Sequence, residues 1–180
     1  MVEILSALLL IIPLIVGGSL HMAAVKLDIM RVLRVPIDTK LFGPNKTWRG
    51  VVLMVAFTIV GVLIAQALEP LFGGGLLVSL RQESALVLGS LLGLAYAAAE
   101  LPNSYLKRRL GVAPGELPKR GRILFLITDQ ADSALGCVLA YAATLSVPAR
   151  VLAILLLFGP VVHLAANSGL YLLGLRKRPV

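Results

Sequence analysis

The sequence predicts an all-α integral membrane protein with about five transmembrane helices, forming a single domain over residues 1–180. Hydrophobic residues make up 58% of the 180 positions and charged residues only 14%, whereas a soluble domain has about 45–50% apolar and about 25% charged residues. In addition, five stretches are long and apolar enough to cross or nearly cross a bilayer, which takes about 20 residues. A soluble helical protein is excluded, because too few polar residues remain to cover its surface.

The predicted spans are separated by connectors of very different length. The first carries Glu3 and has no basic leading region, so we expect a retained helix and not a signal peptide. The fourth and fifth are separated only by a tight turn at Pro148, so they are expected to form a hairpin. The glycines of FGGGLL at 72–77 predict a flexible loop after the second span. The five spans are expected at about 2–25, 51–68, 84–101, 123–146 and 149–175.

Lysine and arginine concentrate in two long connectors, 26–50 and 102–122, and in the C-terminal tail. Each connector holds six of the 17 basic residues and the tail holds three, so 15 fall on one side of the membrane. Only Arg81 and Arg150 fall on the other side. Cytoplasmic loops carry the Lys/Arg excess, so we expect a multi-pass protein of the cell membrane with both connectors and the C-terminus in the cytoplasm and the N-terminus outside.

Three carboxylates, Glu100, Asp129 and Asp132, lie inside predicted spans. An ionisable residue is expensive there and indicates a functional role. Asp129 and Asp132 are three positions apart, so they face the same side of one helix, and Ser133 joins that face. Two anions this close favour protonation of one of them or a hard cation with oxygen ligands, such as Mg²⁺, between them. A proton relay and ion pairs with basic loop residues are the alternatives.

The third span carries a matching polar stripe. Glu100, Asn103, Ser104 and Lys107 fall on one helical face if the helix continues through Pro102, which would kink it. At a rise of about 1.5 Å per residue, the carboxylates of both helices lie roughly 10 Å from the basic ends of those helices. Polar groups at similar depth predict a polar cavity that opens to the cytoplasm.

The first long connector ends in LFGPNKTWRG, which combines turn-forming and basic residues. Backbone N–H groups that lead into a helix N-terminus suit an anion, and Asn45, Lys46 and Arg49 add polar and positive groups. Thr47 is expected either to cap the second helix or to bond a phosphate oxygen. A purely positive-inside anchor with Trp48 at the membrane interface is the alternative. Carboxylates inside a cavity whose opening is lined by basic residues indicate a site for a metal–polyphosphate, in which Mg²⁺ bridges carboxylate and phosphate oxygens.

The stretch NSYLKRR, followed further along by TDQADS, resembles a shortened signature of the CDP-diacylglycerol synthases. The opening of that signature is matched by Ser104, Leu106, Lys107 and Arg108, and its closing carboxylates by Asp129 and Asp132. Gln130 stands where the signature has an arginine, and its K-D pair and Gly-Gly stretch have no clear counterpart, since APGELP occupies that gap.

The chain is more similar to the archaeal branch, the CDP-archaeol synthases. The resemblance is carried by GPNKTWRG, ELPNSYLKRR, APGE and DQADS, and the likeness extends over most of the length of the chain. It implies a Mg-dependent nucleotidyltransferase of phospholipid biosynthesis, in which the phosphate of an isoprenoid glycerol phosphate lipid, 2,3-bis-(geranylgeranyl)-glycerol 1-phosphate, attacks the α-phosphorus of CTP. The products are pyrophosphate and a CDP-activated lipid. The expected partners are therefore CTP, this lipid and the membrane, and no nucleic acid.

On this interpretation Asp129 and Asp132 bind one or two Mg²⁺ ions, and together with Lys107 they are the expected catalytic residues. Glu100 is expected either to support the metal site or to pair with a lysine. The nucleotide and phosphate groups are expected to be bound by Asn45, Lys46, Thr47, Arg49, Asn103, Ser104, Arg108, Gly115 and Ser133.

The main alternative is a small ion- or proton-coupled transporter that uses the Asp pair, and a structural subunit is a weaker one. A transporter needs a polar path to the far side, and the outer halves of the spans contain almost no polar residues. His21 is expected at the membrane interface. His163 and Asn167 are expected to make hydrogen bonds between helices, with direct contact to a ligand as the alternative. The small residues of GSLLGLAYAAA could pack helices closely, which leaves a homo-oligomer open.

Overall fold

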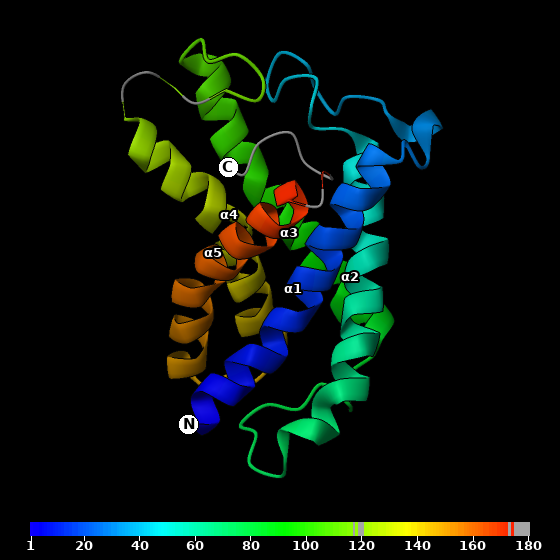
Figure 1. The fold of residues 1–180 in the computed structure, drawn as a ribbon, viewed down its shortest axis with the longest axis vertical. Coiled ribbons are helices and arrows are strands. Elements are labelled where there is room, and N and C mark those ends of the chain that lie inside the picture. Colours follow the sequence, from blue (N-terminus) through cyan, green and yellow to red (C-terminus); the bar gives the residue numbers. More distant parts are fainter. Residues whose placement is uncertain (117, 119–120, 173, 175–180) are drawn as a thin grey trace.

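The computed structural model describes residues 1–116, 118, 121–172 and 174, and their only extended pairing is one isolated bridge between Pro36 and Thr47. The described residues form five long helices, which confirms the predicted all-α fold (Figure 1). The elements are α1 (Val2–Lys26), η1 (Arg31–Leu33), α2 (Trp48–Leu68), η2 (Glu69–Phe72), α3 (Ala85–Arg109), α4 (Arg122–Thr144) and α5 (Ala149–Leu172), where η1 and η2 are short 3₁₀ helices.

Helices α1, α3 and α4, and α2 together with η2, are each long and apolar enough to cross a membrane. In the described part of α5 the apolar segment is shorter and covers Ala149–Val162. Length and composition thus confirm a multi-pass membrane protein with four of the five predicted spans. A complete fifth crossing stays a prediction.

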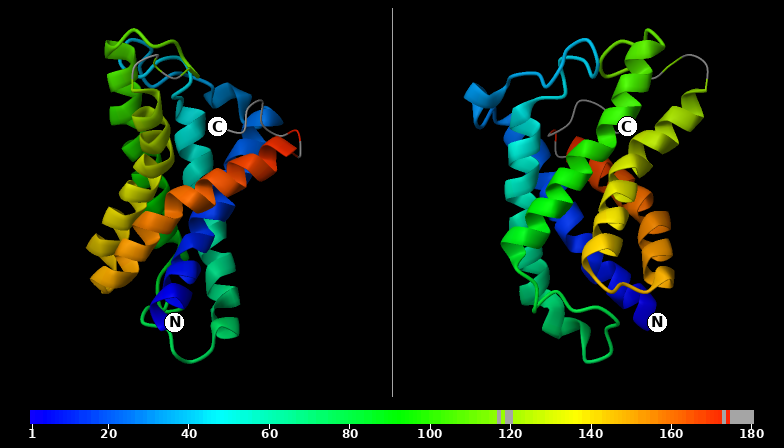
Figure 2. Two further views of the ribbon diagram at one scale, coloured as in Figure 1. Left: turned by 60° about the vertical axis from the view of Figure 1, so that its left-hand side comes forward. Right: turned by 180° about the vertical axis from the view of Figure 1, so that it is seen from behind.

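The helices pack in a ring that follows the chain. Helix α1 contacts both α2 and α5, and α3 contacts both α2 and α4, while α4 and α5 close the ring. Figure 2 shows that α5 runs obliquely across the bundle. The long connectors after α1 and α3 lie at one end, here called the loop end (Figure 1). The N-terminus, the η2 loop and the α4–α5 turn lie at the opposite end, here called the turn end, as the topology prediction requires.

The turn-end half is filled by an apolar core. Fully buried side chains from all five long helices meet there, among them Leu10 of α1, Leu92 of α3 and Leu155 of α5. Tyr141 of α4 is also fully buried, and its hydroxyl donates a hydrogen bond to the Leu10 carbonyl at 2.9 Å. A phenol in an apolar core normally needs such a partner, so the polar tip of this side chain is satisfied within the core.

Glycines bring the helix backbones together in the same half. A Cβ atom on Gly89 or Gly93 of α3 would lie 2.5 or 2.6 Å from a Cα atom of α2, and one on Gly136 of α4 would lie 2.5 Å from the Ala95 carbonyl oxygen. Small residues allow this close approach. The stretch considered for contacts between copies, which contains Gly89 and Gly93, therefore packs within one chain. A homo-oligomer stays an untested prediction.

The loop between α2 and α3, predicted to be flexible around its glycines, is anchored beyond them. Buried Glu69 accepts hydrogen bonds from the Ser79 hydroxyl at 2.5 Å and from the Leu80 N–H at 2.8 Å. Gln66 donates to the carbonyls of Leu80 and Glu83 at 2.7 and 2.9 Å. Glu69, a carboxylate outside the predicted site, thus ties the loop to the end of α2.

Candidate functional site

A cavity of about 490 Å³ occupies the loop-end half. It lies between α1, α3, α4 and α5, and the connector that precedes α2 closes one side. All predicted site residues line it except Thr47 and Arg49. Those that do are Asn45, Lys46, Glu100, Asn103, Ser104, Lys107, Arg108, Gly115, Asp129, Asp132 and Ser133.

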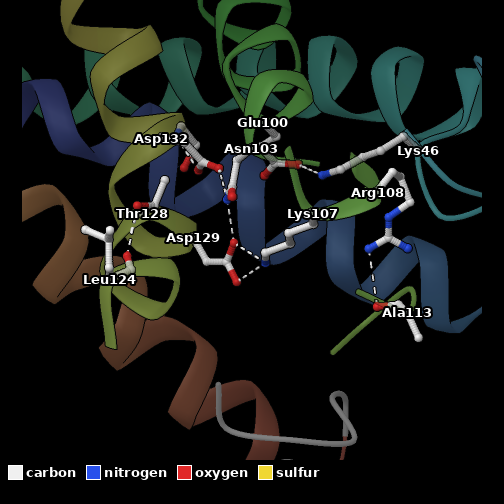
Figure 3. A network of polar contacts seen from close by, with 11 residues as sticks. Lys46, Glu100, Asn103, Lys107, Arg108, Ala113, Leu124, Thr128, Asp129 and Asp132 are labelled. Atoms are coloured by element: carbon white, nitrogen blue, oxygen red, sulfur yellow. Dashed lines mark hydrogen bonds and ion pairs between the residues drawn. The ribbon is translucent and has the colours of Figure 1, made fainter. Parts of the chain in front are cut away.

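Asp129 and Asp132 lie one turn apart on α4, and an amide from α3 joins them. The Asn103 Nδ2 group donates to Asp129 Oδ1 at 2.5 Å and to Asp132 Oδ2 at 3.1 Å (Figure 3). The other oxygen of Asp132 accepts the Ser133 N–H at 2.7 Å. Because both amide hydrogens point at carboxylates, the Asn103 Oδ1 atom is fixed as an acceptor. It is buried and has no hydrogen-bond partner among the described residues.

Two lysines bind the carboxylates of this cavity. Lys107 Nζ lies 2.5 and 2.6 Å from the two carboxylate oxygens of Asp129, and its side chain is only 12% exposed. Lys46 forms an ion pair with Glu100 (Figure 3). Helix α3 continues through Pro102 to Arg109, so the predicted stripe exists and Asn103 and Lys107 reach the same aspartate. For Glu100, the predicted alternative of pairing with a lysine is the one observed.

The connector that carries Lys46 is held by backbone pairing. The Ile37 N–H donates to the Lys46 carbonyl at 2.8 Å, and the Trp48 N–H donates to the Val35 carbonyl at 2.9 Å. Arg108 of α3 packs on Gly43, which has φ +86° and would bring a Cβ atom to 3.4 Å from the arginine Cδ. The Arg108 guanidinium also donates to the Ala113 carbonyl at 3.2 Å, so this side chain contacts both long connectors.

Thr47 and Arg49 lie off the cavity. Thr47 is the N-cap of α2 and accepts the Gly50 N–H at 3.3 Å, which confirms the capping alternative. Arg49 is 5% exposed and forms an ion pair with Asp28 at 2.5 Å. Its expected contact with phosphate therefore has no support in the geometry, because the guanidinium is buried between the first turn of α2 and the connector after α1.

His21 was expected at the membrane interface but lines the cavity. Its Nε2 atom is buried and has no partner among the described residues, and it lies 3.6 Å from the position of a Cβ atom on Gly50. The signal was present in the sequence, because Leu14, Gly18 and His21 follow helical spacing and all three line the cavity.

Buried polar atoms without partners cluster at this cavity. In the described part of the chain there are four such side-chain atoms, and three belong to cavity-lining residues: His21 Nε2, Asn103 Oδ1 and Arg108 Nε. An unsatisfied buried polar atom costs about 1–3 kcal/mol. A polar ligand that supplies the missing partners would recover this free energy.

The donor set suits a metal bound together with a ligand and does not suit a closed metal site. No three His, Cys, Asp or Glu side chains among the described residues group closely enough to hold an ion. Glu100, predicted as a third metal group, is bound by Lys46 instead. Mg²⁺ is typically bound by one or two carboxylates plus waters and substrate phosphates, and Asp129 and Asp132 can supply that part.

The apolar part of the cavity wall comes mainly from α1, with Val162 of α5 and Leu126 of α4. A cavity with one ionic and one apolar wall suits an amphiphilic ligand. The side chains of His163 and Asn167, together with Lys119, Arg120 and the basic tail, lie outside the described residues.

Comparison with known proteins gives consistent matches over most of the chain. A family model described as CarS-like, CDP-archaeol synthase, matches residues 4–180. The CDP-archaeol synthase of Aeropyrum pernix is 34% identical over 186 aligned positions, which cover 98% of this chain and 92% of the relative. That of Natronomonas pharaonis is 30% identical over 146 positions, covering 79% and 73%, and that of Methanococcoides burtonii is 32% identical over 157, covering 78% and 82%. No solved structure matches.

Proposed function

The chain belongs to the CarS-like CDP-archaeol synthase family, and from this premise we propose how the loop-end cavity serves the family's reaction. The protein is a membrane cytidylyltransferase of lipid biosynthesis that makes CDP-archaeol. In our proposal CTP and the phosphate of an unsaturated diether lipid meet in the cavity. The lipid phosphate oxygen forms a bond to the α-phosphorus of CTP, and the bond to the leaving pyrophosphate breaks. The observation that supports this most directly is one cavity with an ionic wall and an apolar wall.

Lys46, Lys107 and Arg108 hold phosphate oxygens in this proposal, because they are the described cationic side chains that line the cavity. Asn45 and Ser104 add hydrogen bonds at the same wall. No side chain has to act as a nucleophile, since the lipid phosphate fills that role. The protein's contribution is then to hold two anionic substrates in line and to balance the developing charge.

Asp129 and Asp132 are the residues proposed to hold Mg²⁺, with Asn103 and the Ser133 N–H fixing the orientation of their carboxylates. The ion would neutralise charge on the triphosphate and favour departure of pyrophosphate. Glu100 is proposed to act through Lys46, whose ammonium group it binds.

The cavity is proposed to face the cytoplasm, because the basic connectors lie at its end of the bundle. CTP would enter between these connectors. The lipid would reach the cavity from the neighbouring leaflet with its chains along the apolar wall formed by α1 and α5.

Transfer of label tests the proposal. The purified chain in lipid vesicles is given Mg²⁺, the diether lipid phosphate and CTP labelled at its α-phosphate. We expect label to enter the lipid fraction and unlabelled pyrophosphate to appear in equal amount. Movement of ions or protons across the vesicle membrane without labelled lipid would contradict the proposal and favour a transporter, for which the comparisons give no support.

A further inference from the structure

The carboxylates of the loop-end cavity are already bound by the protein's own donors. Lys107 contacts both oxygens of Asp129, Asn103 bridges Asp129 and Asp132, and Lys46 contacts Glu100. Every acidic group considered for metal binding therefore has an internal partner that a divalent cation would have to displace or share.

Displacement of Lys107 by a free cation carries a penalty. Its side chain is only 12% exposed, and its ammonium group lies 5.9 Å from the centroid of the Phe125 ring. If a cation took Asp129, the ammonium group would stay in the cavity without a carboxylate. Breaking one side of a buried ion pair costs several kcal/mol, because the other charge is left uncompensated.

A cation that arrives with a triphosphate meets a different situation. The phosphate oxygens offer Lys107 and Lys46 new anionic partners at the moment the carboxylates turn to the metal. Each lysine exchanges a carboxylate for a phosphate, and each carboxylate exchanges a lysine for the cation. No charge is left unpaired in this exchange, so the penalty that opposes the free cation is absent.

We propose that Lys107, with Lys46 beside it, is a resident counter-ion that keeps Asp129 from binding a free divalent cation, so that the site takes its metal only together with a polyphosphate. This inference rests on the proposed function and adds how that same site is regulated. It also implies reciprocal coupling, in which the nucleotide raises metal affinity and the metal raises nucleotide affinity by the same factor.

Binding of Mn²⁺ alone, measured by electron paramagnetic resonance on the full chain in detergent, tests the inference without turnover. We expect weak binding to the wild type. In Lys107→Met, Asp129 is released, and Mn²⁺ should bind at least about ten-fold more tightly, the ratio expected when even a small part of the ion-pair penalty is removed. In Lys107→Met/Asp129→Asn the gain should disappear.

Arg109→Met is the matched control, because it removes a positive charge from the same last turn of α3. Arg109 is exposed and contacts Tyr105, with its Nε 2.9 Å from the phenol oxygen, and it does not line the cavity. Its Mn²⁺ affinity should equal that of the wild type. An equal gain in Arg109→Met would show that only the overall field changed and would overturn the inference.

Lys107→Gln serves as a second variant if Lys107→Met does not fold, since it keeps a hydrogen-bond donor of similar length without the charge. If the wild-type protein binds free Mn²⁺ as tightly as Lys107→Met or Lys107→Gln, the inference is overturned. The proposed function has its own readout in labelled lipid. If the wild type incorporates label but Lys107→Met shows no gain in Mn²⁺ affinity, the proposed function stands and the inference is wrong. If Lys107→Met shows the gain but the wild type incorporates no label, the inference stands and the proposed function is wrong.

Discussion

The two halves of the bundle treat buried polar groups in opposite ways. In the turn-end half, Tyr141, Gln66 and Glu69 all make hydrogen bonds to neighbouring helices or loops. In the described part of the chain, the four buried side-chain atoms without a partner all lie in the loop-end half, on His21, Arg49, Asn103 and Arg108. The turn-end half is complete by itself, whereas the loop-end half has the polar atoms that a ligand would complete.

The difference follows from what each half must do. Glycine contacts let α2, α3 and α4 approach closely in the turn-end half, which excludes water and seals that side. The loop-end half instead keeps ion pairs around a cavity, at a cost in desolvation that packing alone would not require. This separation predicts that substitutions in the loop-end half change activity and that substitutions in the turn-end half change stability.

The largest expected effect is on activity, at Asp132. It accepts hydrogen bonds from the Asn103 amide and the Ser133 N–H, so Asp132→Asn removes the charge with little change in packing. We expect transfer of CMP to fall by at least about 10³-fold, the size typical when a charge acts mainly on the transition state. The melting temperature should move by no more than about 2 °C.

Labelled lipid formation and a thermal melt on the same preparation measure both quantities. Near-normal transfer by folded Asp132→Asn would remove this carboxylate from the active site and with it the proposed metal pair.

The second-largest expected effect is a loss of stability on substitution of Gly136. An alanine there would place its Cβ atom 2.5 Å from the Ala95 carbonyl oxygen and 2.6 Å from Ala99 Cβ. We expect Gly136→Ala to destabilise the bundle by about 1–3 kcal/mol through overpacking. Unfolding in mixed micelles measures this.

Gly169→Ala in α5 is the control, because no atom of the described residues lies within 4 Å of the added Cβ. That variant should be unchanged or more stable by up to about 1 kcal/mol, as expected for alanine in a helix. Equal effects of the two substitutions would show that the α3–α4 contact is looser than described.

A smaller effect tests the boundary between the halves, at Arg49. If this arginine only fixes the connector that carries Lys46, then Arg49→Met and Asp28→Asn should weaken CTP binding equally, each raising KM by about ten-fold with little change in kcat. The double variant should be no worse than either single one, because both break the same ion pair.

A much larger loss in Arg49→Met than in Asp28→Asn would instead mean that the guanidinium contacts the nucleotide. That outcome would restore the expectation drawn from the sequence and would contradict the position of Arg49 off the cavity.

Much of the site could be predicted because its signals are local. Helical spacing placed Asp129, Asp132 and Ser133 on one face, and it placed Asn103 and Lys107 on another. The pairing between these faces was not local. Which lysine binds which carboxylate depends on the packing of α3 against α4 and on the fold of the connector before α2, and neither is encoded by spacing within one segment.

The same limit explains the residues that were misplaced. Arg49 belongs to a motif in which Asn45 and Lys46 line the cavity from the connector. Arg49 itself lies in the first turn of α2, where its guanidinium pairs with Asp28. The burial of Glu69 could not be predicted, because this residue ends a helix, where a carboxylate usually meets solvent. Its burial depends on the loop that folds back over it.

The smallest effect in this series concerns the hydroxyl of Tyr141. Tyr141→Phe keeps the ring in the turn-end core and leaves the Leu10 carbonyl without this donor, so we expect a loss of about 1 kcal/mol in unfolding free energy. Tyr105→Phe is the matched control, since Tyr105 lies at the surface of α3 beside exposed Arg109 and should change stability by less than about 0.5 kcal/mol. Both variants should transfer CMP at the wild-type rate, because neither hydroxyl reaches the cavity. A drop in transfer by Tyr141→Phe at unchanged stability would show that the turn-end core influences the chemistry, and the division between the two halves would then be wrong.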